Sequence, residues 1–198
     1  MMMRMRTTRT NEHDSNVLLS SCTAEDQKKR TGRKRFCWLL IPASAFLLAA
    51  LLNLFVIICA VVPSASMADT ISEGALMVAS RLAYVGGEPG RGDVVLFRHE
   101  ELGGSLIVKR VVGLPGERVE IRQGQVFING EPLAEDYVKG ERTGDFEGVD
   151  VPEDCYFLLG DNRQHSYDAR EWSNPFVERK KIAAKAEFVL FPAFKRIK

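Results

Sequence analysis

The chain has 198 residues and a formal net charge of only +1, which allows one folded domain and a flanking segment but hardly two sizeable domains. The charge is unevenly distributed along the chain. Residues 1–35 carry nine basic and four acidic side chains, residues 36–62 carry none, and residues 63–198 carry 18 basic and 22 acidic side chains. A nucleic-acid-binding protein would concentrate basic charge on its folded part, so nucleic acid is excluded as an expected partner.

The four cysteines argue against a metal site or a disulfide within the folded part. They stand at positions 22, 37, 59 and 155, and only Cys155 lies beyond residue 62. The sequence contains no CxxC pair and no His/Cys cluster with zinc spacing. We therefore expect no metal and no cofactor, and we expect Cys155 to pack as a small buried apolar residue.

Residues 36–62 form an uncharged apolar run of 27 residues. About 20 apolar residues span the hydrocarbon core of a bilayer as a helix. A cleavable signal peptide is the alternative, and Ser64-Ala65-Ser66 resembles a cleavage site, but the basic lead and the apolar core are both too long for one. The run therefore predicts an uncleaved single-pass transmembrane anchor in the cell membrane, with the lipid bilayer as a partner.

The basic residues directly before this run set its expected direction. Six Lys/Arg residues fall within 28–35, and such clusters stay on the cytoplasmic side of a membrane. The prediction is a basic cytoplasmic tail over residues 1–35, an anchor over residues 36–62 and an extracytoplasmic catalytic domain over residues 63–198.

The outer part consists of short apolar stretches separated by turn residues. Residues 72–83 suit a helix, with a strand as the alternative. The expected strands that follow cover residues 93–97, 106–112, 119–121, 125–128, 156–159 and 188–191. Gln123-Gly124 and Asn129-Gly130 are typical of tight hairpin turns. The fold class is therefore mostly β, a single antiparallel, barrel-like sheet tethered by one N-terminal transmembrane helix.

The strand expected over residues 106–112 carries a lysine that could act as a catalytic base. Side chains alternate between the two faces of a strand, so Lys109 shares one face with Ile107 and Val111. If this face is buried, desolvation can lower the pKa of the lysine by up to about 3–5 units. A neutral amine can then act as the base that a hydroxyl nucleophile requires.

Histidine offers a competing base. The outer part contains only His99 and His165. His99 lies in a polar loop and is expected to be solvated. A Ser-His-Asp arrangement through His165 stays open as an alternative, although neighbouring side chains such as Ser166 usually point in different directions.

Four motifs occur in a defined order after the apolar run: PSASM at 63–67, GDVVLF at 92–97, VKRVVGLPG at 108–116 and GDNRQHSYDAR at 160–170. Together with the single anchor they resemble the bacterial type I signal peptidases, a Ser-Lys serine protease family. The resemblance implies a membrane-bound serine endopeptidase that removes N-terminal signal peptides from secretory preproteins. Small residues would precede the cut, and the peptide would bind as an added strand.

The resemblance also implies a role for particular residues. Ser66 would be the nucleophile and Lys109 its general base. The Ser66 backbone N–H and the Ser64 hydroxyl would form the oxyanion hole. Ser166 would orient the lysine amine. Two further sets follow, one bracing the site and one lining the pockets for small substrate side chains: Asp161, Asp168 and Arg170; and Met67, Ile107 and Val108.

One departure from the family pattern lies close to the expected nucleophile. Asp69 stands where the family usually has proline, and a carboxylate directed at Lys109 would raise the pKa of the amine. We expect Asp69 to point to solvent. Two other functions stay open: a dedicated Ser-Lys protease for a pilin or another surface protein, and a non-catalytic membrane-anchored scaffold.

Overall fold

The computed structural model describes residues 41–52, 54–141 and 144–197. The chain divides into two compact units, Met1–Ala50 and Leu51–Lys198. Residues 41–52 and 54–55 are helical. In the part of the chain that the structure describes, no helix combines the length and the apolar character needed to cross a membrane. The expected tail over residues 1–35, and residues 36–40 and 53 of the expected anchor, lie outside the described residues.

The last residues of the expected anchor form a strand instead of a helix. Strand β1 (Ile57–Val61) pairs antiparallel with β2 (Leu76–Ser80), from Ile57 opposite Ser80 to Val61 opposite Leu76. Periodicity cannot separate a strand from a helix within a continuous apolar run, and β-branched residues favour the strand. The helix expected over residues 72–83 was also wrong, because β2 occupies its centre.

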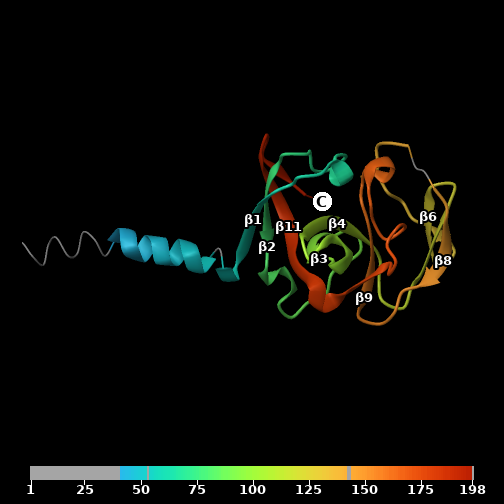
Figure 1. Ribbon diagram of the computed structural model, residues 1–198, viewed down its shortest axis with the longest axis horizontal. Helices are drawn as coiled ribbons and strands as arrows, with labels where there is room; N and C mark the ends of the chain where they lie inside the picture. Colours follow the sequence, from blue (N-terminus) through green and yellow to red (C-terminus); the bar gives the residue numbers. More distant parts are fainter. Residues whose placement is uncertain (1–40, 53, 142–143, 198) are drawn as a thin grey trace, which may run out of the picture. The chain divides into compact units, whose positions relative to one another are not determined.

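The strands form two antiparallel sheets (Figure 1). Among the described residues, the larger sheet has the order β1-β2-β11-β3-β4-β9-β10, with β12 beside β11. Its other strands are β3 (Val94–Arg98), β4 (Leu106–Gly113), β9 (Cys155–Leu159), β10 (Phe176–Glu178), β11 (Ile182–Phe191) and β12 (Lys195–Arg196). The smaller sheet has the order β7-β6-β5-β8, from β5 (Arg118–Arg122), β6 (Gln125–Ile128), β7 (Glu131–Pro132) and β8 (Phe146–Asp150).

Short 3₁₀ helices connect several strands: η1 (Ala65–Met67), η2 (Leu82–Tyr84), η3 (Glu100–Leu102), η4 (Arg163–His165) and η5 (Arg179–Lys181). The mostly β fold is confirmed, with the larger sheet curled as Figure 1 shows. The expectation of a single sheet was wrong, because within the described ranges β5 to β8 pair only with one another.

The hairpins of the smaller sheet form where the turn residues predict them. Gln123 and Gly124 have φ angles of 50° and 74°, and Asn129 and Gly130 have φ angles of 52° and 86°. Two consecutive positive φ angles match the twist of paired strands, and glycine adopts them without a steric cost.

The core lies on both faces of β3 and β4. Val95, Phe97 and Val111 belong to one buried cluster, whereas Val94 and Leu96 belong to another. This alternation is the two-residue period of a strand covered on both sides. Cys155 is half-buried at the margin of the first cluster.

His99 is buried, so the expectation that it is solvated was wrong. Its ring centroid lies 4.2 Å from that of Trp172, and burial lowers the pKa of the imidazole. The surrounding loop is polar in sequence, but this side chain turns inward onto an aromatic neighbour.

Candidate active site

A cavity of about 600 Å³ brings together residues from several parts of the sequence. Ser64 and Ser66 line it directly after β1, and Lys109 lines it from β4. The remaining lining residues are Ala60, Val61, Val62, Pro63, Met77, Leu96, Leu102, Ser105, Leu106, Ile107, Val108, His165 and Tyr167. The expected nucleophile and base therefore share one cavity.

The turn that carries Ser66 is held by the loop that follows β9. Ser66 lies in η1 with only 6% of its surface exposed. The Asn162 backbone N–H donates to the Ser66 carbonyl oxygen at 3.0 Å, and the Asn162 side-chain amide donates to the Ala65 carbonyl oxygen at 3.0 Å. The Ser64 and Ser66 hydroxyl oxygens are 3.3 Å apart. Both hydroxyls are thus presented from a braced backbone.

Lys109 is 2% exposed, and its Nζ donates to the Ser166 hydroxyl at 2.9 Å. Burial lowers the pKa of the amine from 10.5 to about 8. The Arg170 guanidinium also lowers this pKa, whereas the carboxylates of Asp168, Asp161 and Glu171 raise it. The expectation of a buried lysine with a depressed pKa is confirmed, and its largest cause is the predicted desolvation.

Asp168 is the centre of the contacts around Ser166. One of its carboxylate oxygens, Oδ2, accepts hydrogen bonds from the Ser166 hydroxyl at 2.6 Å and from the Gly160 N–H at 3.0 Å. The Arg170 guanidinium binds both carboxylate oxygens, at 2.8 Å and 3.0 Å. Asp168 is fully buried, so these charge-assisted bonds hold Ser166 rigidly against Lys109.

Asp161 belongs to a separate ion pair. The Arg110 guanidinium donates to its two carboxylate oxygens at 2.8 Å and 2.7 Å, and both side chains are almost inaccessible to solvent. The Thr70 hydroxyl also donates to Asp161, and the Arg110 guanidinium lies 4.0 Å above the Tyr137 ring. Asp161 therefore joins β4 to the segment that follows Ser66, whereas Asp168 is the carboxylate that binds the Ser166 hydroxyl.

Gly160 and Asn162 were missed as site residues by sequence reasoning. A Cβ atom on Gly160 would lie 2.1 Å from the Ser166 hydroxyl oxygen and 2.6 Å from the Ser66 carbonyl oxygen. The two segments are so close at this point that no side chain fits between them. Both residues stand inside the GDNR motif, which was the available signal.

A segment after β7 also reaches the site and was not predicted. The buried Glu135 carboxylate pairs with Arg163, whose Nε donates to the Gly160 carbonyl oxygen at 3.0 Å. The Asp69 carboxylate accepts the backbone N–H groups of Lys139 and Gly140 at 2.7 Å and 3.2 Å. Asp69 is half-buried and its carboxylate turns to these two exposed amides, so the expectation that it points to solvent is met only in part.

Two of the three residues expected to line substrate pockets lie in the cavity wall, namely Ile107 and Val108. Met67 is the exception. It is fully buried and packs in the core cluster that contains Met77 and Leu96. Met67 therefore belongs to the core cluster whose members Met77 and Leu96 line the cavity.

The alternative base, His165, is exposed, and its Nδ1 lies 3.3 Å from the Asn162 side-chain oxygen. A histidine base is normally oriented by a carboxylate, so this contact favours Lys109.

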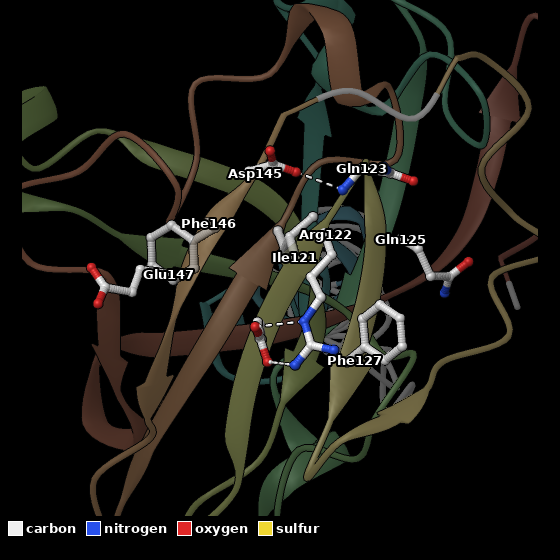
Figure 2. A pocket seen from close by; sticks show the side chains of 9 residues that line it. Ile121, Arg122, Gln123, Gln125, Phe127, Asp145, Phe146 and Glu147 are labelled. Atoms are coloured by element: carbon white, nitrogen blue, oxygen red, sulfur yellow. Dashed lines mark hydrogen bonds and ion pairs between the residues drawn. The ribbon is translucent and has the colours of Figure 1, made fainter.

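A second, more open hollow of about 720 Å³ lies on the smaller sheet. The Arg122 guanidinium binds the Glu120 carboxylate there, and Figure 2 shows Arg122 beside the Phe127 ring. None of the expected site residues lines it. Among the described residues, no group of three or more His, Cys, Asp or Glu side chains could hold a metal ion.

Comparison with known proteins places the chain in a family. The profile of the family "Signal peptidase, peptidase S26" matches residues 35–191. The probable signal peptidase I-2 of Synechocystis sp. is 33% identical over 175 residues, covering 84% of this chain and 79% of that protein. The signal peptidase I of Bacillus licheniformis is 36% identical over 179 residues, covering 84% and 95%.

A crystal structure of a signal peptidase I from Enterococcus faecalis V583 matches with a TM-score of 0.44 and 36% identity, covering 50% of this chain and 96% of that one. The family profile spans well over half of the chain, and two relatives above 30% identity match over most of their own length. The chain therefore belongs to the signal peptidase family, peptidase S26, and is a serine endopeptidase.

Proposed function

We propose that this protein removes N-terminal signal peptides from secretory preproteins, with Ser66 as nucleophile and Lys109 as general base. The observation that carries the proposal is the state of Lys109. Its amine is buried, has a pKa of about 8 and lines the same cavity as Ser66. A lysine kept partly neutral at physiological pH can accept the proton of a hydroxyl.

In the proposed reaction, neutral Lys109 accepts the proton of the Ser66 hydroxyl while Oγ attacks the carbonyl carbon before the cut. The Ser64 hydroxyl and the Ser66 N–H donate to the resulting oxyanion. The C–N bond then breaks, and the Lys109 ammonium returns its proton to the leaving amine. Lys109 next accepts a proton from water, the hydroxide attacks the ester, and Ser66 recovers its hydroxyl proton as the signal peptide leaves with a free carboxylate.

Ser166 and Asp168 position the base in this scheme. Ser166 accepts a hydrogen bond from Nζ and donates one to Asp168, so the amine is held at one place on the cavity wall. The Asp168 carboxylate also stabilises the ammonium that forms during the reaction, because its charge raises the pKa of Lys109.

The edge of β4 offers a binding surface for the substrate backbone. Strand β3 pairs with residues Leu106 to Arg110 along one edge of β4. Strand β9 pairs with the other edge only at Arg110, Val111 and Gly113. Within the described residues, the stretch Leu106–Lys109 thus has one edge without a strand partner. A peptide added there would direct successive side chains to opposite faces of β4, so the small residues at the first and third positions before the cut would share one face.

We further propose a single-pass location in the cell membrane, with a cytoplasmic N-terminus and an extracytoplasmic catalytic domain. The uncharged run over residues 36–62 and the basic flank before it support this topology. Ser66 follows the helical residue Phe55 by 11 positions, a reach of at most about 40 Å. The cut would therefore fall close to the bilayer from which the preprotein emerges.

The proposed function is tested by incubating the detergent-solubilised full chain with a secretory preprotein that carries Ala at the first and third positions before the cut. We expect one new N-terminus, directly after that site, by mass spectrometry. Ser66→Ala should reduce the rate by about 10³-fold or more, whereas Ser72→Ala, at an exposed serine that does not line the cavity, should leave catalysis intact. Undiminished cleavage by Ser66→Ala would remove Ser66 as the nucleophile.

The pH dependence of cleavage should report the titration of Lys109. Because the neutral amine is the active form, kcat/KM should fall about tenfold per pH unit below the pKa of about 8 and level off above it. Arg170 lowers this pKa, so Arg170→Met should move the midpoint to higher pH. Glu171 raises it, so Glu171→Gln should move the midpoint to lower pH.

Rates measured between pH 6 and pH 10 with all three proteins check this prediction. Opposite displacements of the midpoint identify Lys109 as the titrating base. A wild-type midpoint near 6.5, unmoved by either substitution, would point to a histidine instead.

A further inference from the structure

The hairpin tip between β3 and β4 contributes an apolar wall to the cavity. Leu102 and Ser105 line the cavity from this tip, residues 99–105, and Tyr167 lines it from the loop that contains Ser166. Leu102 is 38% exposed and Tyr167 is 45% exposed. Two large side chains from segments far apart in the sequence thus present accessible apolar surface to the same space.

Hydrogen bonds fasten the tip to the segment that follows Ser166. The Tyr167 hydroxyl donates to the Glu101 carboxylate at 3.4 Å. The backbone N–H and the hydroxyl of Ser173 donate to the same carboxylate at 3.0 Å and 2.6 Å. Glu101, which directly precedes Leu102, is therefore bonded to both Tyr167 and Ser173.

Two contacts hold the base of the tip. The rings of His99 and Trp172 pack in a tilted arrangement with centroids 4.2 Å apart, and Lys181 pairs with Glu100 at 2.9 Å. The three residues directly before Leu102 are thus all held by contacts with other segments, which favours a preformed wall over a mobile loop.

The position of this wall along a bound peptide follows from the geometry of β4. The cavity is lined by every residue from Ser105 to Lys109, a stretch of about 13 Å at roughly 3.3 Å per residue. A peptide strand along this edge, with the residue before the cut at Lys109, places its fourth or fifth upstream residue beside Ser105 and Leu102.

We propose that Leu102 and Tyr167 form a specificity subsite that binds a large apolar side chain four or five residues before the cut. The inference rests on the proposed function, because the direction of the peptide depends on small residues lying near Ile107 and Val108. An apolar substrate side chain would be removed from water by packing against the leucine and the tyrosine ring, which favours binding. A polar side chain would gain no binding free energy from this contact.

The test uses two decapeptides with Ala at the first and third positions before the cut. One carries Leu and the other Ser at both the fourth and fifth positions. The wild type should prefer the leucine peptide by about tenfold in kcat/KM, mainly through KM. Tyr167→Ala and Leu102→Ala should each reduce the preference to about threefold or less. Tyr167→Phe, which keeps the ring, should retain it.

Leu82→Ala is the matched control, since Leu82 is also an exposed leucine in a 3₁₀ helix but does not line the cavity; the preference should persist in it. A preference that survives both Tyr167→Ala and Leu102→Ala would overturn the subsite. If that happens while both peptides are still cut after Ala and Ser66→Ala abolishes the cut, the proposed function stands.

Binding of the same two peptides to the Ser66→Ala protein, followed by fluorescence anisotropy, tests the subsite without cleavage. Tighter binding of the leucine peptide, lost on adding Tyr167→Ala, supports the subsite. Equal binding of both peptides contradicts it. Absence of any cleavage by the wild type would count against the proposed function alone.

Discussion

Lys109→Met is expected to abolish most cleavage and, at the same time, to make the folded protein more stable. Methionine has a similar length but no proton acceptor for Ser66. Loss of a positioned general base reduces the rate by about 10²–10⁴-fold. Because the side chain is 2% exposed and lies beside the apolar strand residues of β4, an apolar replacement should pack without a cavity.

The gain in stability follows from the depressed pKa. In the unfolded chain the amine titrates near its ordinary value of 10.5, whereas in the folded protein its pKa is about 8. Below pH 8 the wild type must bury a charge, and at 1.36 kcal/mol per pKa unit this costs on the order of 3 kcal/mol. Loss of the bond to Ser166 offsets part of the gain, which leaves on the order of 2 kcal/mol.

The size of this stability difference changes with pH in a defined window. Between pH 8 and 10.5 the unfolded state binds more protons than the folded state, so wild-type stability rises with pH. Lys109→Met lacks this rise, and its advantage should shrink through the same window.

Urea unfolding at pH 7, 9 and 10.5, together with the cleavage assay, measures both effects. Lys180→Met is the control, because this side chain is 76% exposed and should change stability by no more than about 0.5 kcal/mol. A Lys109→Met protein that is less stable than the wild type at pH 7 would show that the lysine is not held in a desolvated site.

Gly160→Ala should reduce cleavage by about 10²-fold or more, although it adds a single methyl group. The new Cβ would meet the Ser166 hydroxyl oxygen at 2.1 Å and the Ser66 carbonyl oxygen at 2.6 Å. Neither of these two oxygen atoms can move easily to relieve the clash. Ser166 is held between Lys109 and Asp168, and the Ser66 carbonyl is backbone bound by Asn162. Relief of the clash must therefore move the nucleophile, the orienting serine or both.

The same crowding should lower stability by about 1–3 kcal/mol, as overpacking of a rigid interior usually does. Gly87→Ala is the matched control, since the nearest atom to its new Cβ is at 3.9 Å, an ordinary contact. Steady-state kinetics and urea unfolding of both variants check the prediction. If Gly160→Ala cleaves within threefold of the wild type, the close approach of the two segments is not needed for catalysis.

Several features of this protein were decided locally and could be predicted from its sequence. The hairpins at Gln123-Gly124 and Asn129-Gly130 depend on residues that tolerate positive φ. The face that Lys109 shares with Ile107 and Val111 could also be predicted, because the two-residue period holds whichever strands pair with β4. The motifs that carry Ser66, Lys109 and Ser166 were equally visible.

Other features were decided only when distant segments met. The strand at Ile57–Val61 forms because β2 supplies its hydrogen-bond partners, and an apolar run is compatible with a helix until such a partner is present. His99 turned inward onto Trp172, and Asp69 bound the amides of Lys139 and Gly140. The need for glycine at position 160 likewise arises from two segments on either side of it. Periodicity and turn chemistry act over a few residues, whereas burial, pairing and steric exclusion at this site depend on atoms up to about a hundred positions away along the chain.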